Sequence, residues 1–303
     1  MRVVIIGAGL AGLSAACHLR SRDHDVTVIE AGEHPGGRAG TLAIDGYRFD
    51  TGPSVLTFPH LVDECIEALG VDPRDHVTFH RLDPMYRACF ADGSTIAVRA
   101  DRSDMVDEIA RTCGRREADA FDEFADWLRR PYAAEWEPFI ARNYASPLSL
   151  LRRPDALARL ARLGGFGRLE SAVRRRFSDD RLVRLFSFQA LYAGLAPHRA
   201  LALYAVITYM DSVAGVYAAD GGVHAVPAAL AAAAASTGVD IRYRTAATEI
   251  VLANGDSGRV RSVRTDDDTE LACDAVVCTP DLPVAYRTLL PDVAAPRRLA
   301  GAQ

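Results

Sequence analysis

Residues 2–38 read RVVIIGAGLAGLSAACHLRSRDHDVTVIEAGEHPGGR, and this stretch decides the fold. A β-branched run at 3–6 leads into three glycines spaced as G-x-G-x-x-G, and a helix-forming segment follows at 13–20. A second apolar run at 26–29 ends on an acidic residue, Glu30. The pattern predicts a strand–turn–helix–strand unit that opens a Rossmann-like α/β domain.

The three glycines have separate roles in such a unit. Gly7 permits the tight turn, Gly9 lets the backbone approach a pyrophosphate, and Gly12 lets the helix pack closely on the strand. A pyrophosphate would lie on the N–H groups of the helix N-terminus, where the dipole favours an anion. Glu30 would accept hydrogen bonds from a ribose diol and would repel a 2′-phosphate, which argues against NADP. The alternative is a tight turn in an α/β domain that binds no nucleotide.

A second glycine cluster, Gly36-Gly37-Arg38, follows six residues after Glu30. Paired glycines let a loop press its backbone against a bulky ligand without Cβ clashes. Arg38 offers a fork of donors for phosphate or flavin oxygens. Taken alone, the cluster would be a turn followed by a surface cation. Its place directly after Glu30, the acid expected to bind the ribose, favours a ligand-binding role. At this point either NAD or FAD could be the ligand.

With both clusters in place, the sequence resembles the flavin-dependent oxidoreductases of the amine oxidase and phytoene desaturase superfamily. In those proteins the two clusters and the acid form an extended FAD fingerprint, so the resemblance implies FAD rather than NAD. It also extends to a Phe-Asp-Thr-Gly-Pro segment at 49–53 and to a small residue in a late strand whose backbone meets the adenine. The implied cofactor-binding residues are Gly7, Gly9, Gly12, Glu30, Gly36, Gly37, Arg38, Gly52, Pro53 and Ala247.

Length and charge set further bounds. The chain has 303 residues, enough for two domains, and its net charge of −5 argues against nucleic-acid binding. No apolar run reaches the roughly 18–20 residues that span a bilayer. Because the sequence begins directly with a strand, we expect no signal peptide and a cytoplasmic location. Six scattered cysteines form no C-x-x-C pair, and the eight histidines do not cluster, so the sequence predicts no metal site.

The order of elements predicts a split nucleotide domain. We expect a helix at 56–75, strands at 76–99 around an Asp92-Gly93 turn, and helical segments at 101–137 and 185–215, the second of them broken at Pro197. An alanine-rich helix starts near Pro227, and three strands follow at 239–251, 258–265 and 269–278. The domains are therefore an FAD-binding domain from 1–75 and 216–290, a helical plus β substrate- and membrane-binding insert at 76–215, and a tail at 291–303.

A basic segment occupies residues 142–184, where eleven arginines face four acidic residues. Leucines recur at mostly helical spacing between the arginines, so the segment can lie on an anionic membrane surface. The alternative is an ordinary amphipathic helix with a solvated arginine face. The next segment, 185–215, carries an aromatic and apolar stripe that fits either a core or an elongated apolar tunnel.

The middle of the chain narrows the resemblance to the FAD-dependent phytoene desaturases, the carotenoid-type desaturases and isomerases. The resembling stretches are 186–191, 204–210 and 215–230. The resemblance implies a lipophilic polyene substrate, hydride transfer to the flavin, and a location at the inner face of the cell membrane. Asp211, Asp220 and Tyr192 lie in or beside these stretches, but they are equally well explained as surface or turn residues, and the catalytic residues stay unassigned.

Members of that family continue past the point where this sequence stops, and their C-terminal part completes the flavin site. The resemblance therefore implies a C-terminally truncated chain, with exposed apolar surface where the remaining part would pack. If that part is a separate polypeptide, it is a partner chain. Two alternatives stay open: another flavin oxidase of the superfamily, acting on amines or protoporphyrinogen, and a flavin-binding remnant that is inactive or depends on a partner.

Overall fold

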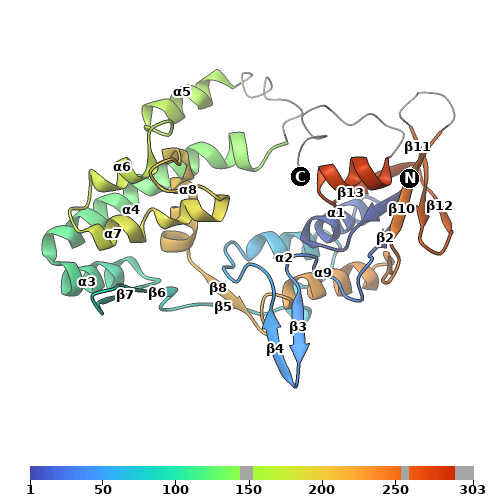
Figure 1. Cartoon of the computed structure of the whole chain (residues 1–303), viewed down its shortest axis with the longest axis horizontal. Coiled ribbons are helices and arrows are strands. Elements are labelled where there is room, and N and C mark those ends of the chain that lie inside the picture. Colours follow the sequence, from blue (N-terminus) through green and yellow to red (C-terminus); the bar gives the residue numbers. More distant parts are fainter. Residues whose placement is uncertain (144–152, 254–258, 291–303) are drawn as a thin grey trace. The chain divides into compact units, whose positions relative to one another are not determined.

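The structure is a computed structural model that describes residues 1–143, 153–253 and 259–290 (Figure 1). It divides into two compact units. Unit 1 contains Met1–His80 and the chain from Ala218 onward, and unit 2 is Arg81–Tyr217. The chain leaves and re-enters unit 1 through two short paired strands, β5 (Phe79–Arg81) and β8 (Tyr217–Ala219).

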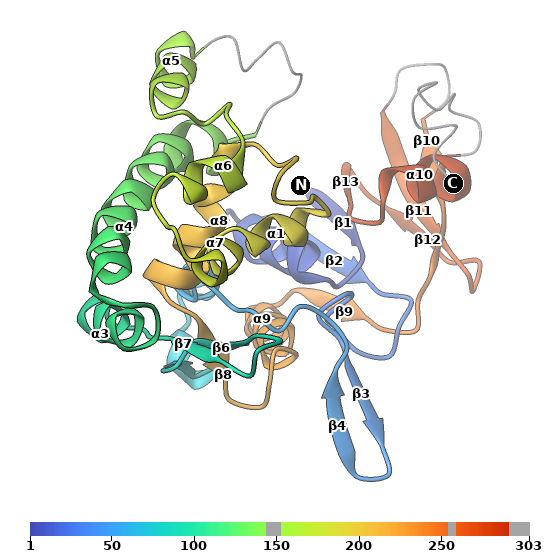
Figure 2. The same ribbon diagram turned by 60° about the vertical axis from the view of Figure 1, so that its left-hand side comes forward.

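The centre of unit 1 is a four-stranded parallel sheet in the order β13-β1-β2-β9 (Figure 2). Its strands are β1 (Arg2–Ile6), β2 (Asp25–Ile29), β9 (Asp240–Arg242) and β13 (Ala275–Cys278). The first strand is thus flanked by its neighbour in sequence and by a strand from the far end of the chain. Val3 to Ile6 are all buried, as expected of a continuous apolar run in a sheet covered on both faces.

Alternate residues of β1 face two different layers. Val3 and Ile5 pack in one apolar cluster with helices α1 (Leu10–Arg20), α2 (His60–Glu67) and α9 (Ala225–Ser236). Val4 and Ile6 pack in a second cluster with an antiparallel sheet of β10 (Ala247–Leu252), β11 (Val260–Thr265) and β12 (Glu270–Ala272). Helices and a second sheet on opposite faces of a parallel sheet confirm the α/β fold class.

The remaining elements of unit 1 are short. A hairpin of β3 (Thr41–Ile44) and β4 (Tyr47–Asp50) follows the second glycine cluster. A 3₁₀ turn η1 (Pro73–Asp75) follows α2. After β13 the described chain ends in α10 (Leu282–Val284) and a π-helical turn η7 (Ala285–Leu289).

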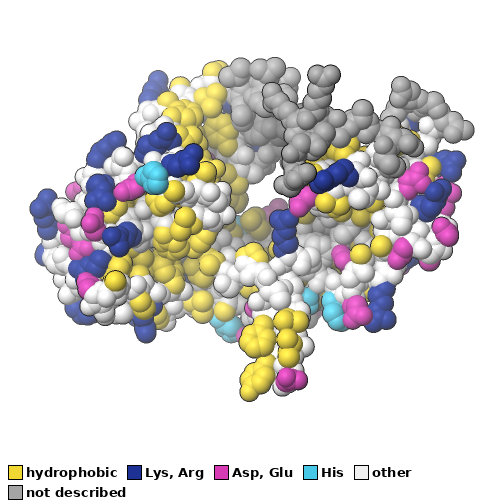
Figure 3. All heavy atoms as spheres, in the orientation of Figure 1, with side chains coloured by type: hydrophobic (Ala, Val, Ile, Leu, Met, Phe, Trp, Pro, Cys, Tyr) yellow, Lys and Arg dark blue, Asp and Glu magenta, His cyan; other side chains and the backbone are white. Residues whose placement is uncertain are grey.

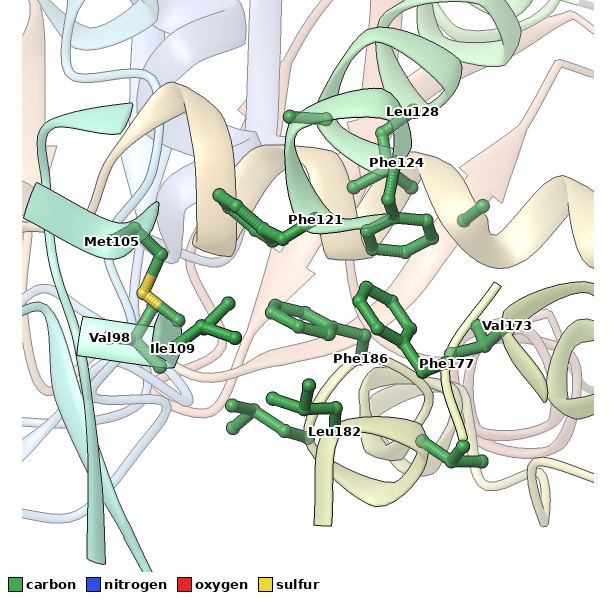
Figure 4. Packing of buried hydrophobic residues seen from close by; sticks show 14 of the residues in the cluster. Val98, Met105, Ile109, Phe121, Phe124, Leu128, Val173, Phe177, Leu182 and Phe186 are labelled. Carbon is green, nitrogen blue, oxygen red and sulfur yellow. The ribbon is translucent and has the colours of Figure 1, made fainter. Parts of the chain in front are cut away.

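Unit 2 is largely helical and has its own core. A hairpin of β6 (Tyr86–Cys89) and β7 (Thr95–Val98) precedes α3 (Arg102–Cys113) and α4 (Arg115–Glu135). The later elements are η2 (Trp136–Ile140), α5 (Pro154–Arg162), α6 (Leu169–Arg174), α7 (Asp180–Leu185), η4 (Phe188–Ala193), η5 (Ala202–Tyr204), α8 (Ala205–Tyr209) and η6 (Met210–Ala214). Four buried rings turn toward one another at its centre, those of Phe121, Phe124, Phe177 and Phe186 (Figure 4).

Several predicted elements differ from the structure. The expected strand at 239–251 is two strands in different sheets, β9 and β10, because Arg244 adopts a positive φ of 53° between them. The strand expected at 269–278 likewise divides into β12 and β13. The helix at 101–137 breaks at Gly114, whose φ is 97°. Residues 56–75 form only the two-turn helix α2 and a 3₁₀ turn.

The segment at 185–215 is less regular than two helices separated at Pro197. It consists of 3₁₀ turns, the short helix α8 and the π-helical turn η6. Part of its stripe is core, since Phe186 is fully buried, whereas Leu191 and Tyr192 are more than half exposed. In the basic segment, residues 144–152 lie outside the described part, as does the tail. Within the ranges that the structure describes, no helix has both the length and the apolar character needed to cross a membrane.

Candidate functional site

The turn between β1 and α1 has the geometry expected of a nucleotide-binding turn. Gly7 has a φ of 101°, and a side chain there would strike the hydroxyl of Thr279. A side chain at Gly12 would strike the Gly7 carbonyl oxygen, so α1 can approach the strand only because this residue is glycine. Both glycines are therefore required by close packing.

The second glycine cluster lies directly against the first. The Gly36 N–H donates to the Ala8 carbonyl at 2.9 Å, and Gly9 and Gly36 form a parallel bridge. A Cβ atom on Gly37 would lie 3.3 Å from the Gly9 Cα. The two predicted clusters thus form one surface of bare backbone.

Glu30 connects this surface to the end of β2. Its carboxylate accepts hydrogen bonds from the Ala8 N–H at 2.8 Å and from the Gly32 N–H at 2.7 Å. An ionised carboxylate has about four acceptor positions, so capacity is left for a diol. The carboxylate is oriented by backbone donors on both sides.

The N-terminus of α1 is open toward an anion. Its N-cap residue is Gly9, which has no side chain to accept a hydrogen bond from the first turn, and that turn carries no acidic residue. The first N–H groups of any α-helix lack partners within the helix. They can therefore serve a phosphate group.

A cavity of about 600 Å³ opens at this point. Its size falls in the range of small-molecule and cofactor sites. Eight of the ten predicted residues line it, whereas Gly12 lies behind the turn and Gly52 packs against the Arg38 carbonyl. The eight are Gly7, Gly9, Glu30, Gly36, Gly37, Arg38, Pro53 and Ala247.

The cavity has a third wall that was not predicted from the sequence. The residues that follow β13, Thr279 to Asp281, line it together with Thr245 and Ala246. Asp281 forms an ion pair with Arg38, with 2.8 Å between Oδ2 and Nη2, and both side chains are largely exposed. The local signal is a polar residue directly after an apolar run, and it indicates the edge that carries the glycine turn only once that run is known to pair in parallel with the first strand.

Unit 2 holds a separate buried polar cluster around Asp211. Its carboxylate accepts hydrogen bonds from the Ser212 hydroxyl at 2.7 Å, the Gln189 amide at 3.3 Å and the Tyr192 hydroxyl at 3.3 Å. Burial raises the pKa of Asp211 to about 7, although these three donors oppose the effect. Asp220, by contrast, is an exposed residue of unit 1 that pairs with His80 at 2.9 Å.

The chain matches the family model of flavin containing amine oxidoreductases over residues 10–302. It belongs to this family. Its cofactor is FAD, and the bare glycine surface, the oriented carboxylate and the open helix end fit a dinucleotide. Among curated proteins, it is 51% identical to a phytoene dehydrogenase of Streptomyces griseus and 34% identical to a zeta-carotene-forming phytoene desaturase of Myxococcus xanthus. The resemblance to phytoene desaturases is thereby confirmed.

Each of these two matches covers 95% of this chain and 55% of the relative. The chain thus spans about half the length of the curated relatives it matches. Among solved structures, an oxidoreductase from Methanosarcina mazei has a TM-score of 0.62 at 17% identity, covering 97% of this chain and 62% of that one. A putrescine oxidase has a TM-score of 0.61 at 19% identity, and the match covers 99% of this chain and 63% of the putrescine oxidase. At these identities the likeness shows the fold alone.

Proposed function

We propose that this chain carries the FAD-binding part of a desaturase that acts on a lipophilic polyene of the phytoene type, in carotenoid biosynthesis. The observation that carries the proposal is the 51% identity to a phytoene dehydrogenase along 95% of the chain. The names of the curated relatives favour this function over the oxidation of amines or protoporphyrinogen. A bound flavin would accept a hydride from a saturated carbon–carbon unit, leaving a new double bond after loss of a proton.

In this proposal the residues of unit 1 bind and orient the cofactor. The first turn of α1 holds the pyrophosphate on its N–H groups, and Glu30 accepts the ribose hydroxyls. Gly9, Gly36 and Gly37 leave room for the ligand against bare backbone. Arg38, although paired with Asp281, keeps further guanidinium donors for the ligand at the cavity wall, and the backbone of Ala247 at the same wall would meet the adenine. The roles of Gly7, Gly12, Gly52 and Pro53 are to shape the turn and the wall.

We further propose that residues 76–215 bind the substrate and that segment 142–184 contacts the inner face of the cell membrane. Helix α5 contributes the exposed Arg159 and Arg162 to this role, while its Ala156 and Leu160 pack inside the protein. Phe166, just beyond α5, is 51% exposed. Arginines around an apolar residue suit an anionic bilayer surface. Flotation with anionic vesicles, compared with neutral vesicles, tests this contact.

A partner polypeptide that completes the flavin site also belongs to the proposal. It would supply the part of the family fold that lies outside the match with the curated relatives. Such a chain would make cofactor binding or activity depend on co-expression.

The decisive experiment is purification followed by an absorption spectrum and anaerobic incubation with phytoene in liposomes. A yellow protein whose flavin absorption bleaches as a conjugated product appears supports the proposal. The assay is run on the chain alone and on the chain co-expressed with the unmatched part of the Streptomyces griseus relative. Absence of bound flavin in both preparations after reconstitution would overturn it, as would bleaching by amines and not by polyenes.

A further inference from the structure

The β3–β4 hairpin of unit 1 gathers four large apolar side chains on one face. The register pairs Leu42 with Phe49 and Ile44 with Tyr47, and paired residues of an antiparallel ladder lie on the same face. Their exposures are 46%, 54%, 49% and 70%, in the order of those pairs. We call these four residues the hairpin face. Figure 3 shows hydrophobic side chains covering much of the hairpin.

The hairpin is fixed at its root. The Asp50 carboxylate accepts a hydrogen bond from the Val223 N–H at 3.0 Å, and the Thr51 N–H donates to the Gly40 carbonyl at 3.0 Å. Its opposite face carries the cross-strand pair Ala43 and Arg48 and has no large apolar residue. The apolar surface is therefore held in a defined orientation from a structured base.

An uncovered surface of this kind is physically unfavourable. A two-stranded hairpin is marginal in water unless a third strand or a helix packs on it. Contiguous exposed apolar side chains on a soluble protein mark a contact site. Within the described residues, β3 and β4 form a sheet of two strands, so each also has an unpaired edge.

The charge of the hairpin and the length of the relatives indicate a polypeptide as the occupant. Residues 41–50 contain Asp45 at the turn, Asp50 at the root and one arginine, so the hairpin is net negative and suits an anionic bilayer poorly. The curated relatives contain almost as much chain again outside the match, since it covers 55% of their length. A polypeptide with an apolar helix or strand face would cover the hairpin.

The root of the hairpin reaches the nucleotide site. Gly40 and Thr51 line a cavity of about 400 Å³ together with Glu30 and Gly37. We propose that the hairpin face is the docking surface for a polypeptide that supplies the remaining part of the family fold. The inference rests on the proposed function in that it specifies where the partner binds. A partner seated there adjoins the wall that holds the ribose acid.

The test uses the unmatched part of the Streptomyces griseus phytoene dehydrogenase as probe, co-expressed with the complete chain. Leu42→Thr/Phe49→Thr alters the hairpin face and keeps the preference for strand. Ala43→Thr/Arg48→Thr alters the opposite face and is the matched control. We expect wild type and control to retain the probe on purification, with at least tenfold weaker binding for the hairpin-face variant. Circular dichroism and thermal melting establish that both variants are folded.

Hydroxyl-radical footprinting gives an independent readout. Tyr47 and Phe49 should be protected in the complex and reactive in the chain alone. The proposal is overturned if wild type retains no probe, if the hairpin-face variant binds as well as wild type, or if the two rings stay reactive. Two further results would overturn it. One is self-association of the chain through the hairpin face, measured by sedimentation. The other is binding of the hairpin face to vesicles of phosphatidylcholine and phosphatidylglycerol, measured by flotation.

The two proposals can fail separately. A complex that forms through the hairpin face but desaturates no polyene contradicts the proposed function and leaves the docking surface standing. A complex that desaturates phytoene equally well with the hairpin-face variant contradicts the docking surface alone.

Discussion

The Glu30 carboxylate accepts a hydrogen bond from the Ala8 N–H, with 2.8 Å between Oε2 and the nitrogen. This bond joins the end of β2 to the glycine turn, so the ribose acid is positioned before any ligand arrives. The same carboxylate is held by the Gly32 N–H on its other oxygen. Orientation of this kind lowers the ordering cost of binding.

Glu30→Gln should weaken FAD binding about ten- to a hundredfold. The change removes a charged acceptor, and hydrogen bonds to charged groups contribute about 1.5–3 kcal/mol. Glu33→Gln is the control, since Glu33 is exposed and pairs with Arg244. Flavin fluorescence titration measures both. Equal affinity of the two variants for FAD would show that Glu30 does not contribute to binding.

Gly36→Ala should abolish FAD binding, because its φ is 129° and a Cβ would lie 2.6 Å from the Ala39 carbonyl oxygen. The loop would have to move away from Ala8. Gly46→Ala is the matched control, since its φ is 82° and no atom lies within 4 Å of the added Cβ. The control should cost only the backbone strain, about 1–2 kcal/mol. Calorimetric titration with FAD separates the two, and binding by Gly36→Ala at wild-type strength would contradict the turn geometry.

Glu135→Gln should stabilise the protein at alkaline pH. Glu135 is buried, its Oε1 has no hydrogen-bond partner among the described residues, and burial raises its pKa to about 8. Because the pKa of Glu135 is higher in the folded than in the unfolded state, its contribution to the free energy of unfolding is complete below about pH 4.5. That contribution is lost as the pH rises through 8. The loss should reach a few kcal/mol, since each tenfold change in acid constant corresponds to about 1.4 kcal/mol.

Thermal melts of Glu135→Gln at pH 5 and pH 8.5 test this, with the exposed neighbour Glu137→Gln as control. The advantage of the Glu135 variant should appear only at the higher pH. An advantage that is equal at both pH values would show that titration of Glu135 is not its cause.

Replacing Asp211 by Asn and by Leu should affect the stability of the protein differently. The pKa of Asp211 is raised by burial to about 7, so its contribution to stability falls between about pH 4 and pH 7. Asp211→Asn keeps an acceptor for the surrounding donors and should remove this pH dependence. Asp211→Leu leaves the donors of Ser212, Gln189 and Tyr192 without that acceptor and should destabilise by about 1–3 kcal/mol or more. Thermal melting curves of both variants across pH 4–8 test this prediction. Equal stability of the two variants at every pH would show that the hydrogen bonds to Asp211 do not stabilise the protein.

Phe186→Ala should cost about 3–5 kcal/mol in the free energy of unfolding. The ring is fully buried and lies 5.2–5.5 Å, between centroids, from three other phenylalanines. Phe166→Ala is the control, because that ring is 51% exposed and should change stability by less than about 0.5 kcal/mol. Urea unfolding gives both values. A small loss for Phe186 would mean that this cluster is not the core of unit 2.

The sequence predicted the parts of the site whose signals are local. Gly7, Gly36 and Glu30 stand at fixed spacing next to a strand, and the structure brings all three to one cavity. Thr279 and Asp281 were missed, because their relation to Gly7 depends on the pairing of β13 with β1. Strand pairing between distant segments leaves no periodic signal in either segment.

Errors in the predicted elements have a similar origin. The segment 239–251 contains no glycine or proline and is therefore predicted as one strand, but Arg244 turns the chain and sends its two halves to different sheets. The aromatic segment at 185–215 has helical composition on both sides of Pro197, yet packing around Asp211 and Phe186 divides it further, into short turns. In both cases tertiary packing overrides local preference.

The place of β13 beside β1 also sets the order in which the protein can fold. The Arg2 N–H donates to the Asp274 carboxylate, 272 positions later in the sequence. One edge of β1 therefore stays unpaired until β13 has been synthesised. All of unit 2 emerges from the ribosome in that interval. Contacts of such long sequence separation form slowly, and an open strand edge invites aggregation meanwhile. We therefore expect the nucleotide cleft to assemble last, and expression yield to depend on how well the nascent chain is protected until then.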